Sequence, residues 1–219
     1  MRAVTMHGPR DVRVEERHKP VIQQPTDAII KVVAACVCGS DLWPYRGIAD
    51  YGPEARMGHE YVGIVEQVGD AVAAVGPGDF VVGSFFASDN TCEICRSGYQ
   101  SRCVQNQNMT GAQAEYLRVP LADGTLVATP AMPDADLVPA LLTASDVLGT
   151  GWFAAAAAQA GPGKTVAVVG DGAVGLLGIL AARQLGAERV IAMSRNPARQ
   201  ALARDPEVFR RGGDAASSG

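Results

Sequence analysis

Residues 58–72 read GHEYVGIVEQVGDAV, in which a histidine and a glutamate stand directly before a run rich in β-branched residues. Such a run predicts a β-strand, and His59 and Glu60 lie where the preceding loop turns into it. Imidazole and carboxylate groups are both ligands of Zn²⁺ in proteins. Because a strand fixes the direction of the side chains at its start, this stretch predicts a functional site rather than a solvated pair.

Two further candidate ligands lie elsewhere in the chain. Cys38 follows an apolar run at 32–37 that predicts a strand, and Asp146 precedes a helix-like segment. Three protein ligands and one open position are typical of a catalytic zinc, so we predict a site of Cys38, His59 and Asp146 with Glu60 beside them. Taken singly, each ligand also has a structural explanation: a small buried hydrophobe, a hydrogen-bonded core histidine or a helix cap, respectively.

These residues carry a resemblance to a known family. Residues 58–72 match the signature of the zinc-containing alcohol dehydrogenases at every fixed position, and the resemblance to this medium-chain dehydrogenase family extends to about Arg204. It implies an α/β protein with a mostly-β N-terminal part: a GroES-like catalytic domain at 1–147 and the first part of a Rossmann-type nucleotide-binding domain at 148–204. The ligand set of cysteine, histidine and aspartate resembles the NADP-dependent secondary-alcohol branch.

The resemblance also implies catalytic roles. A bound zinc polarises an alcohol and lowers its pKa, so that hydride can leave for the nucleotide. Ser40 would take the departing proton, Glu60 would exchange onto the metal, and Asp41 would orient the imidazole of His59. Many relatives continue the proton path with a histidine at the position that Trp43 occupies here, so the exit path is left open.

A second set of ligands has the spacing of a structural zinc site. Asp89, Cys92, Cys95 and Cys103 follow one another at intervals of three, three and eight residues, where relatives with a structural zinc place four cysteines. A carboxylate is an acceptable zinc ligand, so we predict a closed site of one aspartate and three cysteines. The alternative is three free thiols. The odd total of five cysteines argues against a disulfide framework, and we interpret Cys36 as a core residue.

A glycine-rich loop predicts nucleotide binding. The apolar run 165–169 predicts a strand buried on both faces, and Gly170, Gly172 and Gly175 separate it from a helical run at 176–185. In this context the motif GxGxxG lets a pyrophosphate approach the start of a helix. The three glycines are therefore predicted to bind the dinucleotide.

The residues after the next predicted strand, 189–193, bear on which dinucleotide is bound. Ser194, Arg195 and Arg199 stand where NAD-binding relatives hold the ribose with an acidic residue. Since no carboxylate is expected there and a guanidinium can bind a 2′-phosphate, the sequence favours NADP over NAD. The alternative is that the arginines are solvated.

Short runs with Gly/Pro turns between them predict an antiparallel, barrel-like first domain, with strands at 29–33, 61–68 and 80–82. Residues 139–158 predict alanine-rich helical structure leading to the second domain. The tail at 205–219 departs from the family and is predicted to be disordered. The chain therefore resembles a truncated or frame-shifted member whose activity is impaired.

The sequence allows two alternatives to an active alcohol dehydrogenase. One is a non-catalytic zinc-binding fragment, folded in its first domain. The other is the zinc-free quinone reductase branch, which is disfavoured because it has no use for Cys38, His59 and Asp146 together. The expected partner is a small alcohol, aldehyde or ketone, and the family forms homo-oligomers.

Composition excludes several classes of function. The net charge is −4 and the pI about 5.4, without a basic stripe, which argues against nucleic acid as a partner. The first ten residues lack the apolar core of a signal peptide, and the apolar stretch 173–182 is too short to span a bilayer. We therefore expect a cytoplasmic protein without a membrane partner.

Overall fold

The computed structural model describes residues 1–205, and the chain divides by its contacts into two units. The first is Met1–Ser145, and the second begins at Asp146. Each unit has its own hydrophobic core. Apart from Asp205, the tail that was predicted to be disordered lies outside the described residues.

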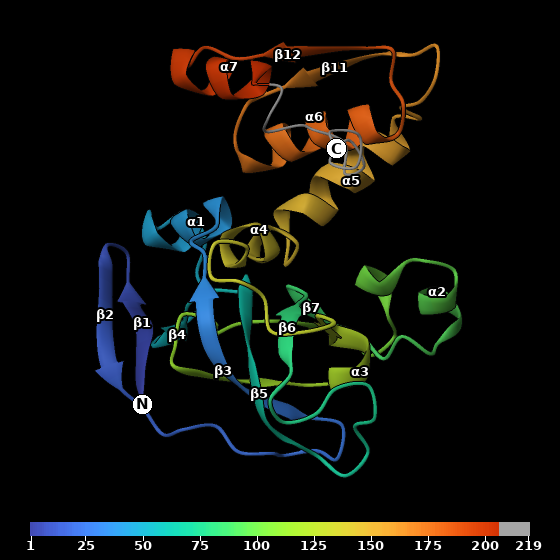
Figure 1. The fold of residues 1–219 in the computed structure, drawn as a ribbon. Helices are drawn as coiled ribbons and strands as arrows, with labels where there is room; N and C mark the ends of the chain where they lie inside the picture. Colours follow the sequence, from blue (N-terminus) through green and yellow to red (C-terminus); the bar gives the residue numbers. More distant parts are fainter. Residues whose placement is uncertain (206–219) are drawn as a thin grey trace. The chain divides into compact units, whose positions relative to one another are not determined.

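The first unit is built mainly from antiparallel strands (Figure 1). Its strands are β1 (Arg2–Gly8), β2 (Asp11–Glu16), β3 (Ala28–Ala35), β4 (Ala55–Arg56), β5 (Tyr61–Val68), β6 (Phe80–Gly83), β7 (Phe86–Ala87), β8 (Gln107–Asn108), β9 (Tyr116–Val119) and β10 (Leu126–Ala128). Its helical segments are η1 (Gly39–Asp41), α1 (Leu42–Tyr45), α2 (Glu93–Arg96), η2 (Gln100–Arg102), α3 (Ala122–Thr125) and α4 (Val138–Thr143).

The strand order places β5 at the centre of the main sheet. That sheet runs β10-β6-β5-β3-β9, a smaller one runs β2-β1-β4, and β7 pairs with β8. A bridge between Ala3 and Ala114 joins β1 to the segment before β9. The predicted short antiparallel strands are confirmed, although they form open sheets in linear order rather than one hydrogen-bonded ring.

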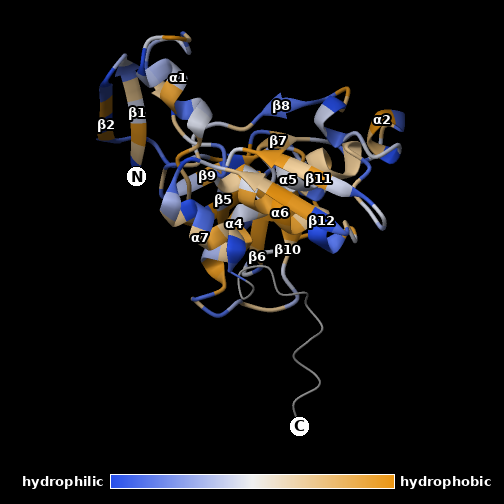
Figure 2. Ribbon diagram, turned by 90° about the horizontal axis from the view of Figure 1, so that it is seen from above, coloured by the Kyte–Doolittle hydropathy of each residue, from blue (hydrophilic) through white to orange (hydrophobic). Residues whose placement is uncertain are grey.

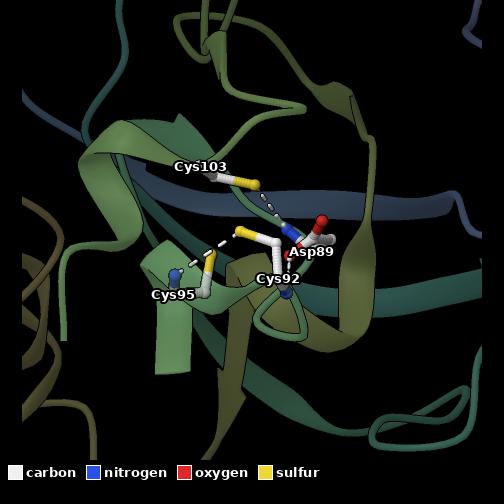
Figure 3. Close-up of side chains that lie close together, drawn as sticks. All are labelled: Asp89, Cys92, Cys95 and Cys103. Atoms are coloured by element: carbon white, nitrogen blue, oxygen red, sulfur yellow. Dashed lines mark hydrogen bonds between the residues drawn. The ribbon is translucent and has the colours of Figure 1, made fainter. Parts of the chain in front are cut away.

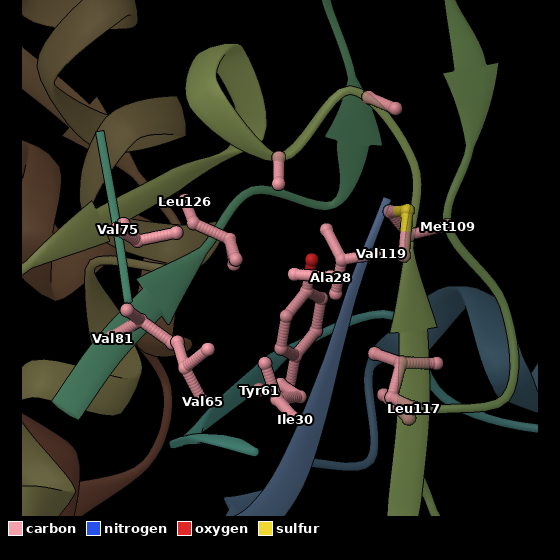
Figure 4. Close-up of a cluster of buried hydrophobic side chains, with 13 residues drawn as sticks. Ala28, Ile30, Tyr61, Val65, Val75, Val81, Met109, Leu117, Val119 and Leu126 are labelled. Carbon is pink, nitrogen blue, oxygen red and sulfur yellow. The ribbon is translucent and has the colours of Figure 1, made fainter. Parts of the chain in front are cut away.

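The core of the first unit gathers around Tyr61, the first residue of β5 (Figure 4). Its side chain is completely buried, and its ring lies among aliphatic residues that include Ile30, Val65 and Leu117. Gly83 pairs with Tyr61 across β5 and β6, and a Cβ atom on Gly83 would lie only 2.0 Å from the ring. The glycine in β6 therefore makes room for the largest side chain of this core.

A buried ion pair ties β9 to the start of β3. The carboxylate of Asp27 accepts hydrogen bonds from Nε and Nη2 of Arg118 at 2.6 and 3.0 Å. It also accepts from the backbone N–H groups of Gln23 and Gln24 at 2.9 and 2.8 Å. Burial alone would raise the pKa of Asp27, but these donors stabilise the charged form and the net pKa is lowered.

The second unit contains parallel strands joined by a helix. Its elements are α5 (Val147–Ala157), β11 (Thr165–Val169), α6 (Ala173–Gln184), β12 (Arg189–Met193) and α7 (Pro197–Arg204). The strands pair in parallel, and α6, which is largely hydrophobic like β11 (Figure 2), packs against α5 through Ala155, Ala181 and Ala182. Among residues 1–205, no helix combines the length and the apolar character needed to span a membrane.

The prediction that the strand at 165–169 is buried on both faces is wrong for the described residues. Val166 and Val168 are half-buried, whereas the alternate residues are exposed, and Val169 retains 82% of its surface. The reason is that the hydrophobic cluster of this unit takes in Val166 on one face only. No element within residues 1–205 covers the other face of β11 to the same extent.

We predict that Asp27→Asn lowers the free energy of unfolding of the first unit by about 2–3 kcal/mol at pH 7, because it leaves Arg118 without its buried counter-charge. The lowered pKa of Asp27 means that its contribution is present above about pH 4 and is lost as the pH falls through the folded-state value. The difference between the two proteins should therefore shrink in acid.

Urea unfolding measures this effect. A Trp152→Phe background leaves Trp43 as the single tryptophan, so that its fluorescence reports on the first unit. Asp11→Asn is the matched control, since Asp11 pairs with Arg13 on the surface and should have a much smaller effect. Equal losses for the two variants would contradict the proposed role of the buried pair.

Candidate functional site

A glycine with a left-handed backbone delivers His59 and Glu60 to the start of β5. Gly58 has φ +87°, and a Cβ atom there would lie 2.6 Å from the side chain of Gln113. Its carbonyl accepts from the N–H of Ala112 at 3.0 Å. A tight backbone contact with the segment before β9 therefore sets where the next two side chains point, and only glycine fits there.

Cys38 is positioned by a turn rather than by a strand. The sequence predicted a strand up to residue 37, but β3 ends at Ala35 and Cys38 stands at the N-cap of η1. Its backbone N–H donates to Oδ2 of Asp41 at 2.9 Å. The carboxylate of Asp41 thus holds the turn that presents the thiol.

The predicted contact between Asp41 and His59 is not a hydrogen bond. Nδ1 of His59 lies 3.8 Å from Oδ1 of Asp41, which exceeds hydrogen-bonding distance. The carboxylate is buried, and its Oδ1 atom is the one that faces the ring. Phe85 packs edge-on against the imidazole with ring centroids 6.4 Å apart. The ring is therefore packed against Phe85 and lies near the carboxylate of Asp41 without donating a hydrogen bond to it.

Ser145 fixes the position of Asp146, and the sequence analysis did not identify Ser145 as a functional residue. The buried hydroxyl of Ser145 accepts from the N–H of Tyr61 at 3.0 Å and donates to the carbonyl of Gly83 at 2.5 Å. These bonds anchor Ser145 in the first unit, and Asp146 is the next residue along the chain. Oδ1 of Asp146 accepts a hydrogen bond from the hydroxyl of Thr150 in α5 at 2.8 Å. The side chain of Asp146 makes no capping hydrogen bond with the backbone N–H groups of that helix.

The structure brings the predicted catalytic ligands together. One ligand atom from each of Cys38, His59, Glu60 and Asp146 lies within 4.8 Å of the others. A thiol, an imidazole and two carboxylates suit Zn²⁺, so the donor set fits the metal that the sequence predicted. Glu60 is 2% exposed. Ser40 lies exposed on η1, two residues past Cys38.

The second set of ligands also comes together, in a lobe around α2 (Figure 3). One ligand atom from each of Asp89, Cys92, Cys95 and Cys103 lies within 4.8 Å of the others. Backbone N–H groups support them: Asp89 Oδ1 accepts from Cys92 at 3.0 Å, and the sulfur of Cys103 accepts from Asp89 at 3.4 Å. Cys95 and Cys103 are buried, and no cysteine of the chain forms a disulfide.

The pKa values of the ligand groups in this lobe are shifted in different directions. Backbone N–H groups of Cys92 and Thr91 lower the pKa of Asp89, and those of Val104 and Cys95 lower the pKa of the Cys92 thiol. Burial, followed by the neighbouring Cys92 side chain, raises the pKa of the Cys95 thiol to about 12. The backbone donors thus favour the charged forms of Asp89 and Cys92, burial favours the neutral thiol of Cys95, and a bound cation would displace the thiol protons.

The glycine-rich loop fits the approach of a pyrophosphate. Gly170 has φ +100°, and a Cβ atom on Gly175 would lie 2.3 Å from the carbonyl oxygen of Gly170. Gly172 is the N-cap of α6, and as a glycine it offers no side chain to cap the helix. No atom lies within 4 Å of the position that a Cβ atom would take there. The first and third glycines are therefore required by the loop itself, and the second keeps the space before the helix open.

The structure places a carboxylate beside Ser194, contrary to the premise of the NADP prediction. The hydroxyl of Ser194 donates to Asp171, and Nη1 of Arg199 lies 3.6 Å from Oδ1 of the same residue. Arg195 is exposed. The sequence reading missed Asp171 because it considered acidic residues only at the end of the second strand. A charged residue inside the glycine-rich loop was the available signal, since parallel strands end at one sheet edge.

Comparisons with known proteins agree with this geometry. The model of the alcohol dehydrogenase GroES-like domain matches residues 24–131, which confirms the GroES-like fold predicted for the first unit. Zinc-type alcohol dehydrogenase B of Aspergillus flavus is 39% identical over 93% of this chain and 50% of that protein. The medium chain reductase/dehydrogenase ucsI of an Acremonium species is 40% identical over 93% of this chain and 73% of that protein.

A solved structure gives the same result. The alcohol dehydrogenase TADH from Thermus sp. ATN1 superposes with a TM-score of 0.85 and 38% identity, over 93% of this chain and 60% of that chain. This chain thus spans about half the length of the Aspergillus relative and somewhat more of the Thermus enzyme.

We predict that Ser145→Ala lowers the free energy of unfolding of the first unit by about 1–3 kcal/mol, because it leaves the Tyr61 N–H and the Gly83 carbonyl buried without their partner. Urea unfolding measures the change. Ser101→Ala, at an exposed position, is the matched control and should stay within about 0.5 kcal/mol of the parent. A Ser145 variant as stable as the control would show that this hydroxyl does not hold the segment before Asp146.

Proposed function

This chain belongs to the zinc-type alcohol dehydrogenase family of medium-chain dehydrogenases and reductases, and on that premise we propose that it acts as a zinc-dependent oxidoreductase. The proposed reaction transfers hydride between an alcohol, or its aldehyde or ketone, and NAD(P). The observation that carries the proposal is the convergence of Cys38, His59, Glu60 and Asp146 within 4.8 Å. Those side chains come from a turn, a strand entrance and a helix start, so their meeting is a property of the fold.

In the proposed mechanism Cys38, His59 and Asp146 hold the zinc. When bound, the metal acts as a Lewis acid that lowers the pKa of an alcohol. Glu60 supplies a buried carboxylate at the same point and can replace another ligand. Ser40 is exposed two residues past Cys38, and we propose that its hydroxyl accepts the proton of the alcohol while releasing its own proton to water. A histidine in place of Trp43 is then not needed for proton release.

The lobe around α2 is proposed to be a structural zinc site. Its four ligand atoms come from Asp89, Cys92, Cys95 and Cys103, and a closed set of four protein ligands leaves no position for substrate. The lobe contributes few residues to the core clusters, Cys95 and Cys103 being its buried members. A bound cation would therefore supply cohesion that apolar packing does not.

The second unit is proposed to be a Rossmann-type nucleotide-binding region. Support comes from its parallel strands, the helix between them, and the open space at Gly172 before the N-terminus of α6. The sequence-based prediction of NADP rests on Ser194, Arg195 and Arg199, and the contacts of Asp171 with two of these residues count against it. The cytoplasmic location and the homo-oligomeric state, both expected from the sequence, are parts of the same proposal.

A zinc-binding protein without dehydrogenase turnover is the second candidate function. The observation that favours it is the lobe around α2, whose closed set of four ligands would hold a cation and leave no position for substrate. Assays of turnover with purified protein separate the two candidates.

We predict that the purified chain binds two zinc ions and that each site can be emptied separately. Cys38→Ala should leave only the lobe zinc, and Cys95→Ser only the catalytic zinc, because each substitution removes one ligand of one cluster. Native mass spectrometry counts the ions, and circular dichroism verifies folding. His18→Ala is the matched control and should retain both ions, since His18 is exposed and belongs to neither cluster.

The same samples test catalysis. Reduction of NAD or NADP is followed at 340 nm with a panel of primary and secondary alcohols. The proposal expects turnover that is abolished in Cys38→Ala and retained in His18→Ala. Zinc binding without turnover in the parent chain would favour the second candidate. A Cys38→Ala variant that keeps both ions would overturn the proposed catalytic site.

A further inference from the structure

Asp171 occupies the second position of the glycine-rich loop and faces the residues that follow β12. The pairing of Val169 with Met193 brings the ends of both strands to one edge of the sheet, and the N–H of Gly170 donates to the carbonyl of Met193 at 3.0 Å. There the carboxylate of Asp171 accepts from the hydroxyl of Ser194. The side chain of Asp171 is only 13% exposed, so these contacts are partly shielded from solvent.

The hydrogen-bonding capacity of Ser194 is taken up by these contacts. The N–H of Asn196 donates to the oxygen of Ser194 at 3.0 Å. The single hydroxyl proton of Ser194 is donated to Asp171, and the more distant carbonyl of Asn196, at 3.4 Å, is the alternative acceptor. A phosphate group needs donors, because all its free oxygens are acceptors. Ser194 can therefore serve a 2′-phosphate only if it releases Asp171.

The negative charge of Asp171 also disfavours a 2′-phosphate. Nη1 of Arg199 lies 3.6 Å from Oδ1 of Asp171, so the guanidinium that was expected to bind a 2′-phosphate already faces an anion. A phosphate dianion placed here would also meet the negative charge of Asp171, and like charges in a partly buried site repel strongly. A ribose 2′-hydroxyl, by contrast, can donate a hydrogen bond to that carboxylate.

We propose that Asp171 determines the dinucleotide selectivity of this protein, favouring a free 2′-hydroxyl over a 2′-phosphate. The inference rests on the proposed function, because it assumes that the loop binds a dinucleotide. NAD-binding relatives are expected to carry the ribose-binding acid at the end of the second strand, where Ser194 follows β12 in this chain. The proposal assigns that role instead to Asp171, in the loop that follows β11. Arg195, exposed on the same turn, favours the opposite choice and gains influence when the charge of Asp171 is removed.

The test compares two probes that differ only at the 2′ position: 5′-AMP and adenosine 2′,5′-bisphosphate. Isothermal titration of the full chain measures both dissociation constants at low salt. The parent chain should bind 5′-AMP more tightly. Asp171→Asn should strengthen binding of the bisphosphate at least about tenfold, the order expected for one charge-assisted contact, and change 5′-AMP binding much less. The gain should shrink at high salt, because it is electrostatic.

Two further variants sharpen the result. Glu188→Gln removes one exposed carboxylate at the opposite end of β12 and should leave the ratio of the two constants unchanged. Adding Arg199→Ala to Asp171→Asn should remove most of the gain, because that guanidinium is the group released. The preference of the parent chain needs no variant, so it tests the proposal even if Asp171→Asn does not fold.

The outcomes separate this inference from the proposed function. Binding of both probes with a ratio that Asp171→Asn leaves unchanged would overturn the selectivity role alone. A parent chain that prefers the bisphosphate would do the same. Failure of every folded variant to bind either probe would overturn the nucleotide site, and with it the role of Asp171.

Discussion

The hydroxyl of Ser145, held between the N–H of Tyr61 and the carbonyl of Gly83, is the interaction on which the candidate metal site depends. It joins the central strand β5, its neighbour β6 and the segment that leads to α5. Glu60 precedes Tyr61 and Asp146 follows Ser145, so a single buried contact brings both carboxylates to the same point. If this contact were lost, the two halves of the ligand set would no longer be constrained to meet.

Buried acidic groups in this protein divide into structural and chemical ones according to their partners. Asp27 is satisfied completely by Arg118 and two backbone N–H groups, so its charge stabilises the fold and is not available for chemistry. Glu60 is equally buried but lies among other metal-capable side chains. Asp41 is intermediate, because one oxygen holds the Cys38 turn while the other lies near His59. The burial of a carboxylate alone does not identify its role.

The two units use glycine for related reasons. Gly58 allows a tight contact that directs His59, and Gly175 allows the first turn of α6 to pass close to Gly170. In both places the backbone approaches another segment more closely than any Cβ atom permits, and a functional group lies next to the contact. Asp171 is placed in this way, since the loop that requires Gly170 and Gly175 also directs the carboxylate of Asp171 at Ser194 and Arg199.

Local pattern sufficed for the elements and for the chemistry of their residues. The strand at 61–68, the helix after the glycine motif and the ligand spacing 89, 92, 95 and 103 could all be read from the chain, because each depends on neighbours a few residues apart. The tertiary structure alone decided two other points: the anchoring of Ser145 and the meeting of Asp171 with Ser194. These contacts join segments that are far apart in the sequence, so no local pattern predicts that they meet. They stabilise the protein only when the segments are packed together.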